Sequence, residues 1–267
     1  MRRLLAALTV LLALAACGGN DSGSSSDGAL KVGVSPVPHG EILTYIKDNL
    51  AEKEGLDLEI VEFNDYVQPN VALQDKQLDA NYFQHKPYLA EEVKAKGYKF
   101  TALEPVHIEP LGLYSKKVKD LAAVPEGGVV AIPNDPSNSG RALNLLAANN
   151  LITLKDGVGV NATERDIASN PKKLTFKALE AAQLPRSLDD TALSVINGNY
   201  AIETDLNPAK DALALESGTD NPYANLLVVR TGDEKDERIA KLEKLLHSPE
   251  VKKFIEDKYS GSVLAAF

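Results

Sequence analysis

The chain has 267 residues, 29 of them basic and 38 acidic, and its net charge of −9 argues against nucleic acid as a partner. It contains one cysteine and no tryptophan, which excludes an internal disulfide and a cysteine-based metal site. This length is at the upper limit for one hydrophobic core and is ample for two lobes.

The first 16 residues read as a signal peptide. Arg2 and Arg3 supply a positive start, and an uncharged apolar stretch follows from Leu4 to Ala16. At 13 residues, this stretch is too short to cross about 30 Å of hydrocarbon as a helix, which disfavours a permanent transmembrane anchor.

Cys17 closes this segment in the sequence Leu14-Ala15-Ala16-Cys17, which resembles the bacterial lipobox, where cleavage leaves an acylated cysteine as the first residue. The alternative is an ordinary signal peptide followed by a chance cysteine. Residues 18–28 are small and polar, so they cannot bury enough surface to offset the entropy lost on ordering. We therefore expect a lipidated cysteine and a flexible tether over residues 17–28, which anchor the protein on the extracytoplasmic side of a cell membrane.

Short strand patterns and helix patterns alternate through the first half of the remaining chain. Strands are predicted at Ala29–Val34, Leu56–Phe63, Leu78–Phe83, Tyr98–Leu103 and His107–Tyr114. Helices are predicted at Pro38–Glu54, from Pro69 onward, and from Pro87 to Gly97. Strands separated by helices of this length favour an α/β sheet, rich in parallel strands, with helices on its faces.

A second series of the same kind follows. It begins with a strand at Val129–Ile132 and a helix at Ser139–Asn149, and ends with two helices. The alternation continues through Leu174–Leu179, Leu188–Ile196, Tyr200–Glu203 and Leu226–Val229. Two α/β units predict two lobes with a ligand cleft between them. We expect residues 29–112 to form lobe 1, residues 113–225 lobe 2, and residues 226–267 a C-terminal segment that returns to lobe 1.

Dense polar and aromatic strings stand out along the chain. They are NDYVQPN at residues 64–70, FQHKPYL at 83–89, PNDPSNSGRAL at 133–143, LPRSLDD at 184–190 and PYANL at 222–226. These strings resemble the methionine-binding lipoproteins of the MetQ (NlpA) family, and the similarity runs from about Leu30 to the C-terminus. The resemblance implies a two-lobed periplasmic-binding-protein-like (type II) fold, methionine as the ligand, and the permease and ATPase subunits of an ABC importer as partners.

Methionine offers a carboxylate, an ammonium and a thioether, and the chain holds a candidate for each. A carboxylate is best held by a guanidinium, and Arg141 lies in the first turn of a predicted helix, where the dipole also favours an anion. A thioether gains from an aromatic wall, which Tyr66, Phe83 and Tyr88 can build. On sequence alone, Arg141 could instead be a solvated surface residue, and Phe83 and Tyr88 core packing.

Further polar candidates are His85 and Asn225 in these strings, and Asn197 and Glu109 outside them. The resemblance nominates His85 in the pocket, and it nominates Asn197 and Asn225 on lobe 2, although most asparagines serve as turn or cap residues. Glu109 suits the ammonium, or alternatively a lysine on the surface. A metal site at His85 is disfavoured because the histidines show no paired ligand spacing, and we expect no cofactor.

Two other classes of function compete with a binding protein. An amino-acid-modifying enzyme on the same scaffold would use His85 or Glu109, but the chain has none of the motifs G-x-S-x-G, G-x-G-x-x-G, G-x-x-x-x-G-K-[ST] and H-E-x-x-H. A surface adhesin or scaffold would need no small-molecule ligand, and the dense polar strings count against it. We therefore expect a methionine-binding protein that is not an enzyme.

Overall fold

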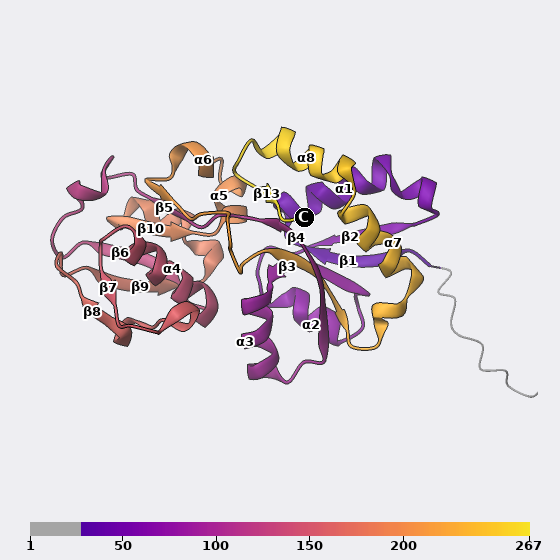
Figure 1. Ribbon diagram of the computed structural model, residues 1–267, viewed down its shortest axis with the longest axis horizontal. Coiled ribbons are helices and arrows are strands. Elements are labelled where there is room, and N and C mark those ends of the chain that lie inside the picture. Colours follow the sequence, from indigo (N-terminus) through magenta and orange to yellow (C-terminus); the bar gives the residue numbers. More distant parts are fainter. Residues whose placement is uncertain (1–27) are drawn as a thin grey trace, which may run out of the picture.

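The computed structural model describes residues 28–267. The predicted signal peptide, Cys17 and all but the last residue of the tether lie outside the described residues. In Figure 1 the described chain forms two lobes side by side, each built on a sheet with helices against it. This arrangement confirms the predicted α/β class. None of the helices in this part of the chain is long and apolar enough to cross a membrane.

The first sheet has six strands in the order β13-β4-β12-β3-β1-β2. Its strands are β1 (Leu30–Val34), β2 (Leu58–Glu62), β3 (Ala80–His85), β4 (Phe100–Ile108), β12 (Asn225–Arg230) and β13 (Leu264–Ala265). The first three strands are parallel, whereas β12 runs antiparallel to both β3 and β4. The sheet is therefore mixed, because β12 and β13 return from the far end of the chain.

Helices cover both faces of this sheet. They are α1 (Glu41–Asn49), α2 (Gln68–Gln74), α3 (Lys86–Lys96), α7 (Glu237–Leu246) and α8 (Pro249–Tyr259). The apolar stripe of α7 packs with α1, α8 and β1 in one core, while Leu73 of α2 and Leu89 of α3 pack with Leu226 and Val228 on the other face. Figure 1 shows α1 and α8 above the strands of this sheet, α7 at their right-hand end, and α2 and α3 below them.

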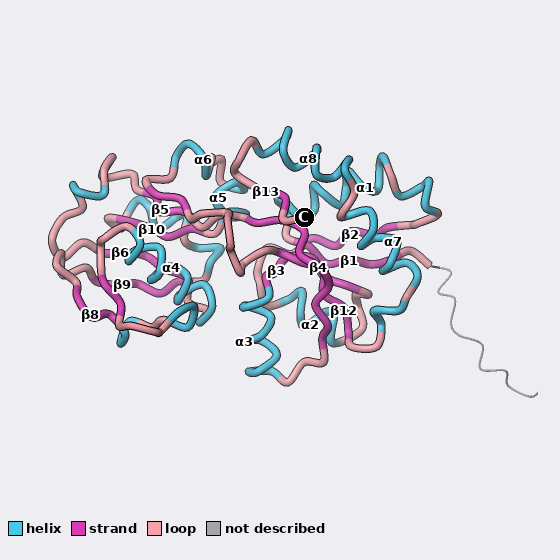
Figure 2. The backbone as a smooth tube through the Cα atoms, viewed as in Figure 1, coloured by secondary structure: helices cyan, strands magenta, loops and turns pink. Residues whose placement is uncertain are grey.

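The second sheet has five strands in the order β11-β5-β10-β6-β9. They are β5 (Gly112–Tyr114), β6 (Val129–Pro133), β9 (Thr175–Leu179), β10 (Leu193–Ile196) and β11 (Ala214–Leu215). The helices of this lobe are α4 (Pro136–Ala148), α5 (Gly198–Glu203) and α6 (Pro208–Asp211), and β7 (Thr153–Leu154) pairs with β8 (Ile167–Ser169) beside them. Figure 2 shows long loop segments in this lobe. Short helices of three to five residues interrupt these loops. These short helices are η3 (Leu121–Ala123), η4 (Gly159–Asn161), η5 (Glu164–Asp166), η6 (Ala181–Gln183) and η7 (Pro185–Asp189), while η1 (Pro36–Gly40), η2 (Ala51–Glu54) and η8 (Asp233–Lys235) belong to the first lobe.

The chain passes between the two sheets twice. The first passage joins β4 to β5, and the second joins β11 to β12. Gly112, expected in lobe 1, is already in the second sheet. Asn225, expected on lobe 2, opens β12 in the first sheet, where it pairs with His85 and His107. The reason is that backbone pairing of β12 with β3 and β4 begins at Asn225 itself.

The helix that carries Arg141 begins earlier than predicted. Asp135 caps α4 by accepting a hydrogen bond from the backbone N–H of Asn138 at 2.8 Å, and Pro136 occupies the first helical position. Arg141 is therefore the sixth residue of the helix and lies beyond its first turn. The expectation that Arg141 lies in the first turn of its helix is wrong, because Asp135 and Pro136 start the helix before Ser139.

Candidate functional site

All seven side chains predicted to bind a ligand line one pocket where the two lobes meet. Its lining is Tyr66, Phe83, Gln84, His85, Tyr88, Glu109, Asn138, Arg141, Asn197, Gly198 and Asn225. The space between these side chains, including the open solvent at its mouth, is about 330 Å³.

An aromatic wall forms the side of the pocket contributed by the first lobe. The ring centroids of Tyr66, Phe83 and Tyr88 lie 5.9–6.0 Å from one another, in tilted or edge-to-face contacts. The phenol of Tyr88 donates to the backbone oxygen of Tyr66 at 3.0 Å. Phe83 and Tyr88 are buried, but they face the pocket, so the alternative of simple core packing does not describe them.

His85 links this wall to the second lobe as a neutral imidazole. It caps α3, because its Nδ1 accepts the backbone N–H of Tyr88 at 3.2 Å. The other nitrogen, Nε2, therefore carries the proton and donates to Oδ1 of Asn138 at 3.1 Å. Burial, with the nearby charge of Arg141, lowers the pKa of His85 to about 3. This histidine is a fixed hydrogen-bond donor in the pocket at neutral pH.

Arg141 is held by groups of its own chain. Its Nε lies 3.0 and 3.1 Å from the two carboxylate oxygens of Glu216, and its Nη2 lies 2.5 Å from Oε2 of the same residue. Nη2 also donates to the backbone oxygen of Glu109 at 2.9 Å, and the ring of Tyr223 lies 4.3 Å from the guanidinium. Burial raises the pKa of Glu216, but the charge and hydrogen bonds of Arg141 outweigh it and leave that pKa below its usual value.

This pairing occupies part of the guanidinium that the sequence predicted to hold a ligand carboxylate. A guanidinium makes two parallel hydrogen bonds to a carboxylate along one edge, and Glu216 occupies that edge. Among the described residues, Nη1 has no hydrogen-bond partner. A ligand carboxylate would therefore meet Nη1 of a guanidinium that is already oriented, rather than an unpaired arginine.

Asparagine side chains supply the neutral polar groups of the site. Oδ1 of Asn138 accepts from His85 and from Nδ2 of Asn197 at 3.1 Å, while its Nδ2 donates to Asp135. Oδ1 of Asn197 is buried without a partner in the described chain. Asn225 accepts from Nε2 of His39 at 3.1 Å. An unpartnered buried acceptor is costly unless a ligand satisfies it.

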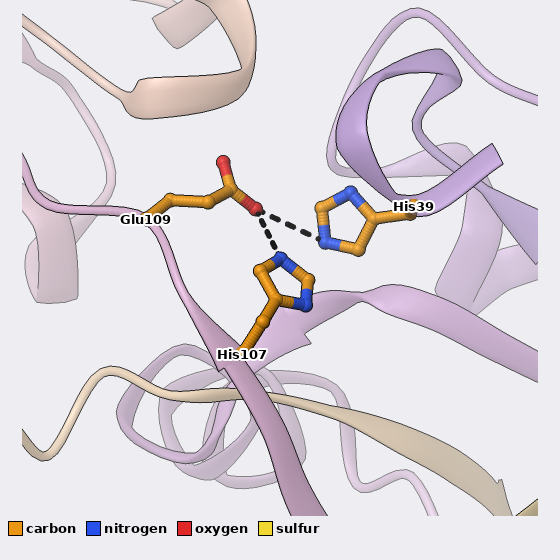
Figure 3. A group of neighbouring side chains, drawn as sticks. All are labelled: His39, His107 and Glu109. Carbon is orange, nitrogen blue, oxygen red and sulfur yellow. Dashed lines mark hydrogen bonds and ion pairs between the residues drawn. The ribbon is translucent and has the colours of Figure 1, made fainter. Parts of the chain in front are cut away.

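Glu109 is the acidic group of the pocket, and its partners are histidines. Figure 3 shows one of its oxygens, Oε1, facing His39 and His107, at 3.2 and 2.9 Å from their Nε2 atoms. Glu109 is buried, so the alternative of a surface lysine partner is wrong. Gly198 permits this packing, because a Cβ at that position would lie 2.8 Å from Cβ of Glu109.

Several residues that line the pocket or lie next to it escaped the sequence-based prediction. Gln84 and Asn138 lie inside the strings that were singled out, and so does Tyr223, which covers Arg141, so proximity to predicted residues was the available signal. Two further histidines, His39 and His107, are far apart in sequence, and only the fold brings His39 to His107 and Glu109. We found no sequence signal for Glu216.

The chain matches the model of the family described as NlpA lipoprotein over residues 30–267. It is 44% identical over 260 residues to the D-methionine-binding lipoprotein MetQ of Salmonella typhimurium (strain LT2), which covers 97% of this chain and 94% of that protein. A nutrient binding protein from Burkholderia cenocepacia bound to methionine superposes with a TM-score of 0.86 at 50% identity, covering 90% of this chain and 100% of the other. An ABC transporter, periplasmic substrate-binding protein from Coxiella burnetii superposes with a TM-score of 0.85 at 43% identity, covering 89% and 100%.

These similarities extend over nearly the whole chain and over both lobes, so they apply to the pocket as well as to the sheets. They confirm the predicted two-lobed fold of substrate-binding proteins and the resemblance drawn from the polar strings. The chain belongs to the NlpA lipoprotein family.

Proposed function

We propose that this protein binds methionine in the pocket between its lobes and delivers it to an ABC importer. The pocket supports this because it joins an aromatic wall, suited to a thioether, to an oriented guanidinium, a buried carboxylate and an unpartnered amide oxygen. Methionine is zwitterionic at one end and apolar at the other. Two similar proteins add to this support: one is named as a D-methionine-binding lipoprotein, and the structure of the other is described as bound to methionine.

Different residues of the pocket contact different parts of the ligand. Tyr66, Phe83 and Tyr88 surround the side chain, and Nη1 of Arg141 receives the carboxylate. The ammonium is placed near the carboxylate of Glu109 and the free Oδ1 of Asn197. His85, Asn225 and Asn138 form hydrogen bonds that hold the polar side chains of both lobes in place around the polar end of the ligand.

The cellular setting follows from the same proposal. Cleavage before Cys17 and its acylation would tether the binding lobes to the extracytoplasmic face of a membrane. The permease and ATPase subunits of an ABC importer are the proposed partners, in line with the ABC transporter substrate-binding protein that the chain resembles.

Native mass spectrometry of the purified, never-unfolded protein is the first test. We expect a bound mass equal to methionine, because a ligand enclosed between two lobes dissociates slowly. An unaltered ligand in one copy per chain fits a binding protein. Turnover of the ligand on incubation would contradict the proposal in favour of an enzyme.

Calorimetry on the ligand-stripped protein tests the site. Arg141→Ala and Asn225→Ala should each weaken methionine binding by at least about tenfold, since each removes a polar group from the pocket. Thermal unfolding is measured beside it, because Arg141→Ala also leaves Glu216 without its cation. Asn170→Ala, at a turn where Asn170 bonds only its own loop, is the matched control. Unchanged affinity in both pocket variants would reject the site.

A further inference from the structure

A buried polar cluster lies directly behind the pocket. It consists of His39 from η1, His107 from β4, and Glu109 from the passage between β4 and β5 (Figure 3). One ligating atom of each side chain lies within 4.8 Å of the other two. The two histidines are at most 1% exposed and Glu109 is 6% exposed. Of the three, only Glu109 lines the pocket.

The hydrogen bonds around this cluster assign its protons. Oε1 of the Glu109 carboxylate can only accept, so Nε2 of His107, 2.9 Å away, donates to it. Nδ1 of this neutral imidazole is then an acceptor, and the hydroxyl of Tyr82, which burial keeps protonated by raising its pKa, donates to it. Nε2 of His39 faces two acceptors, Oε1 of Glu109 at 3.2 Å and Oδ1 of Asn225 at 3.1 Å, so it also carries a proton.

Both imidazoles are therefore neutral N–H donors that converge on one carboxylate oxygen. Burial lowers the pKa of His39 to about 4 and that of His107 to about 3, which agrees with the proton assignment. The backbone N–H of Asn199 also bonds the Glu109 carboxylate. These three donors fix where the carboxylate lies and which way its second oxygen faces.

The negative charge of Glu109 is not balanced by a cation within the cluster. Glu216 already pairs with Arg141, so these two charges cancel. The neutral histidines add none, and burial accordingly raises the pKa of Glu109. Within the described residues, the site thus holds one acidic group with donors but no cation, beside the unpartnered oxygen of Asn197. A cation supplied by the ligand would complete it.

The geometry favours an ammonium over a metal ion. Ligand atoms around a tetrahedral Zn²⁺ with bonds of ~2.0–2.1 Å lie about 3.4 Å apart. The separations of 2.9 and 3.2 Å in this cluster are hydrogen-bond lengths instead. A metal would also need both Nε2 atoms deprotonated, which the donor arrangement opposes.

We propose that His39 and His107 are positioning residues that hold Glu109 to receive the ligand's ammonium, and that this cluster makes the pocket select α-amino acids over analogues without an amino group. The inference rests on the proposed methionine-binding function, and it adds that the pocket recognises the ammonium group of the ligand. It assigns a role to two histidines that do not line the pocket.

The test compares two ligands on the ligand-stripped full chain by calorimetry: methionine and its analogue without the amino group, 4-(methylthio)butanoate. The wild type should prefer methionine by at least about tenfold, the effect of a hydrogen-bonded charge. Glu109→Gln, His107→Phe and His39→Phe should each weaken methionine binding by about tenfold or more while changing affinity for the analogue by less than about threefold.

Glutamine provides the matched variants. Its amide nitrogen can stand near the position of histidine Nε2, so His107→Gln and His39→Gln should keep most of the preference for methionine. A merely structural role would weaken both ligands equally, and that result overturns the inference. If His107→Phe does not fold, the His39 pair and Glu109→Gln still decide the question.

The outcomes separate this inference from the proposed function. A wild type that binds neither compound rejects the proposed function. A wild type that binds both compounds equally well leaves methionine binding intact and overturns the selection by Glu109. Stoichiometric Zn²⁺ in the purified protein, measured by elemental mass spectrometry and lost with Glu109→Gln, also overturns it.

Discussion

Single residues in this pocket are held by their neighbours before any ligand arrives. Arg141 is fixed by Glu216 and Tyr223, Glu109 by two histidines, and His85 by the start of its own helix. Orienting a long or charged side chain costs entropy. Because folding has already met that cost here, more of the contact energy remains for binding.

The neutral, buried state of His85 has a consequence for stability against pH. Its pKa is lowered from 6.5 to about 3, so the unfolded chain takes up a proton below pH 6.5 while the folded chain does not. As the pH falls from about 6.5 toward 3, this residue should therefore remove up to about 1.4 kcal/mol of unfolding free energy per pH unit. Above about pH 6.5 its contribution should not change.

His85→Asn isolates this contribution, because asparagine also caps helices and does not titrate. Denaturant unfolding of both proteins is measured from pH 8 down to pH 5. The stability difference, wild type minus variant, should be constant above about pH 7 and should fall on acidification. A difference that stays constant across the whole range would show that His85 is not buried in its neutral form.

At the level of elements, the ends of secondary structures build the site. His85 closes β3 and caps α3, Asn197 precedes α5, and Asn225 opens β12. Backbone groups at such ends lack partners within the element, so side chains there both cap and reach outward. The N-cap of α4 shows this best, since Asp135 holds both the helix and the side chain of Asn138.

Asp135→Ala should therefore affect both stability and binding. Loss of the cap should cost about 1 kcal/mol of unfolding free energy, and the freed Asn138 should weaken methionine binding severalfold. Ser248→Ala removes the N-cap of α8, which bonds Val251 away from the pocket. This control should lose similar stability without losing affinity. Equal affinities in the two variants would refute the link through Asn138.

On the scale of the whole molecule, the two lobes bond each other directly. The hydroxyl of Tyr66 donates to Oδ1 of Asn199 at 2.5 Å, and the hydroxyl of Tyr200 donates to the backbone oxygen of Asn64 at 3.3 Å. Tyr66 lines the pocket, and the ring of Tyr200 lies 5.1 Å from the ring of Tyr66. The chain passes between the lobes only twice among the described residues. These contacts favour the closed arrangement, and a ligand touching both lobes would add to them.

Tyr66→Phe should loosen this closure while keeping the aromatic wall. Losing one hydrogen bond of about 1 kcal/mol should weaken methionine binding by roughly fivefold, mainly through faster dissociation. Stopped-flow release measures the rate, and small-angle scattering measures the closed fraction. Tyr45→Phe, on α1 away from the pocket, is the control. A release rate equal to that of the wild type would argue against a latch at Asn199.

Much of the molecule follows from local patterns in the sequence. The two helices predicted at the end of the chain are α7, whose buried face is formed by Ile239, Leu242, Leu245 and Leu246, and α8, which Ser248 caps and Pro249 opens. The polar strings contained six of the seven residues predicted to bind the ligand; Asn197 lies outside them. Helix periodicity, capping and short motifs depend on near neighbours in the chain, so a sequence alone can reveal them.

Tertiary structure alone decided the rest. Asn225 belongs to the first sheet because β12 crosses back to pair with β3 and β4, and Glu216 meets Arg141 across 75 residues of chain. His107 is only two residues from Glu109 in sequence, whereas His39 reaches Glu109 only when η1 lies beside β4. Partners so distant in sequence leave no spacing to read, because the contacts between them depend on how sheets and lobes pack.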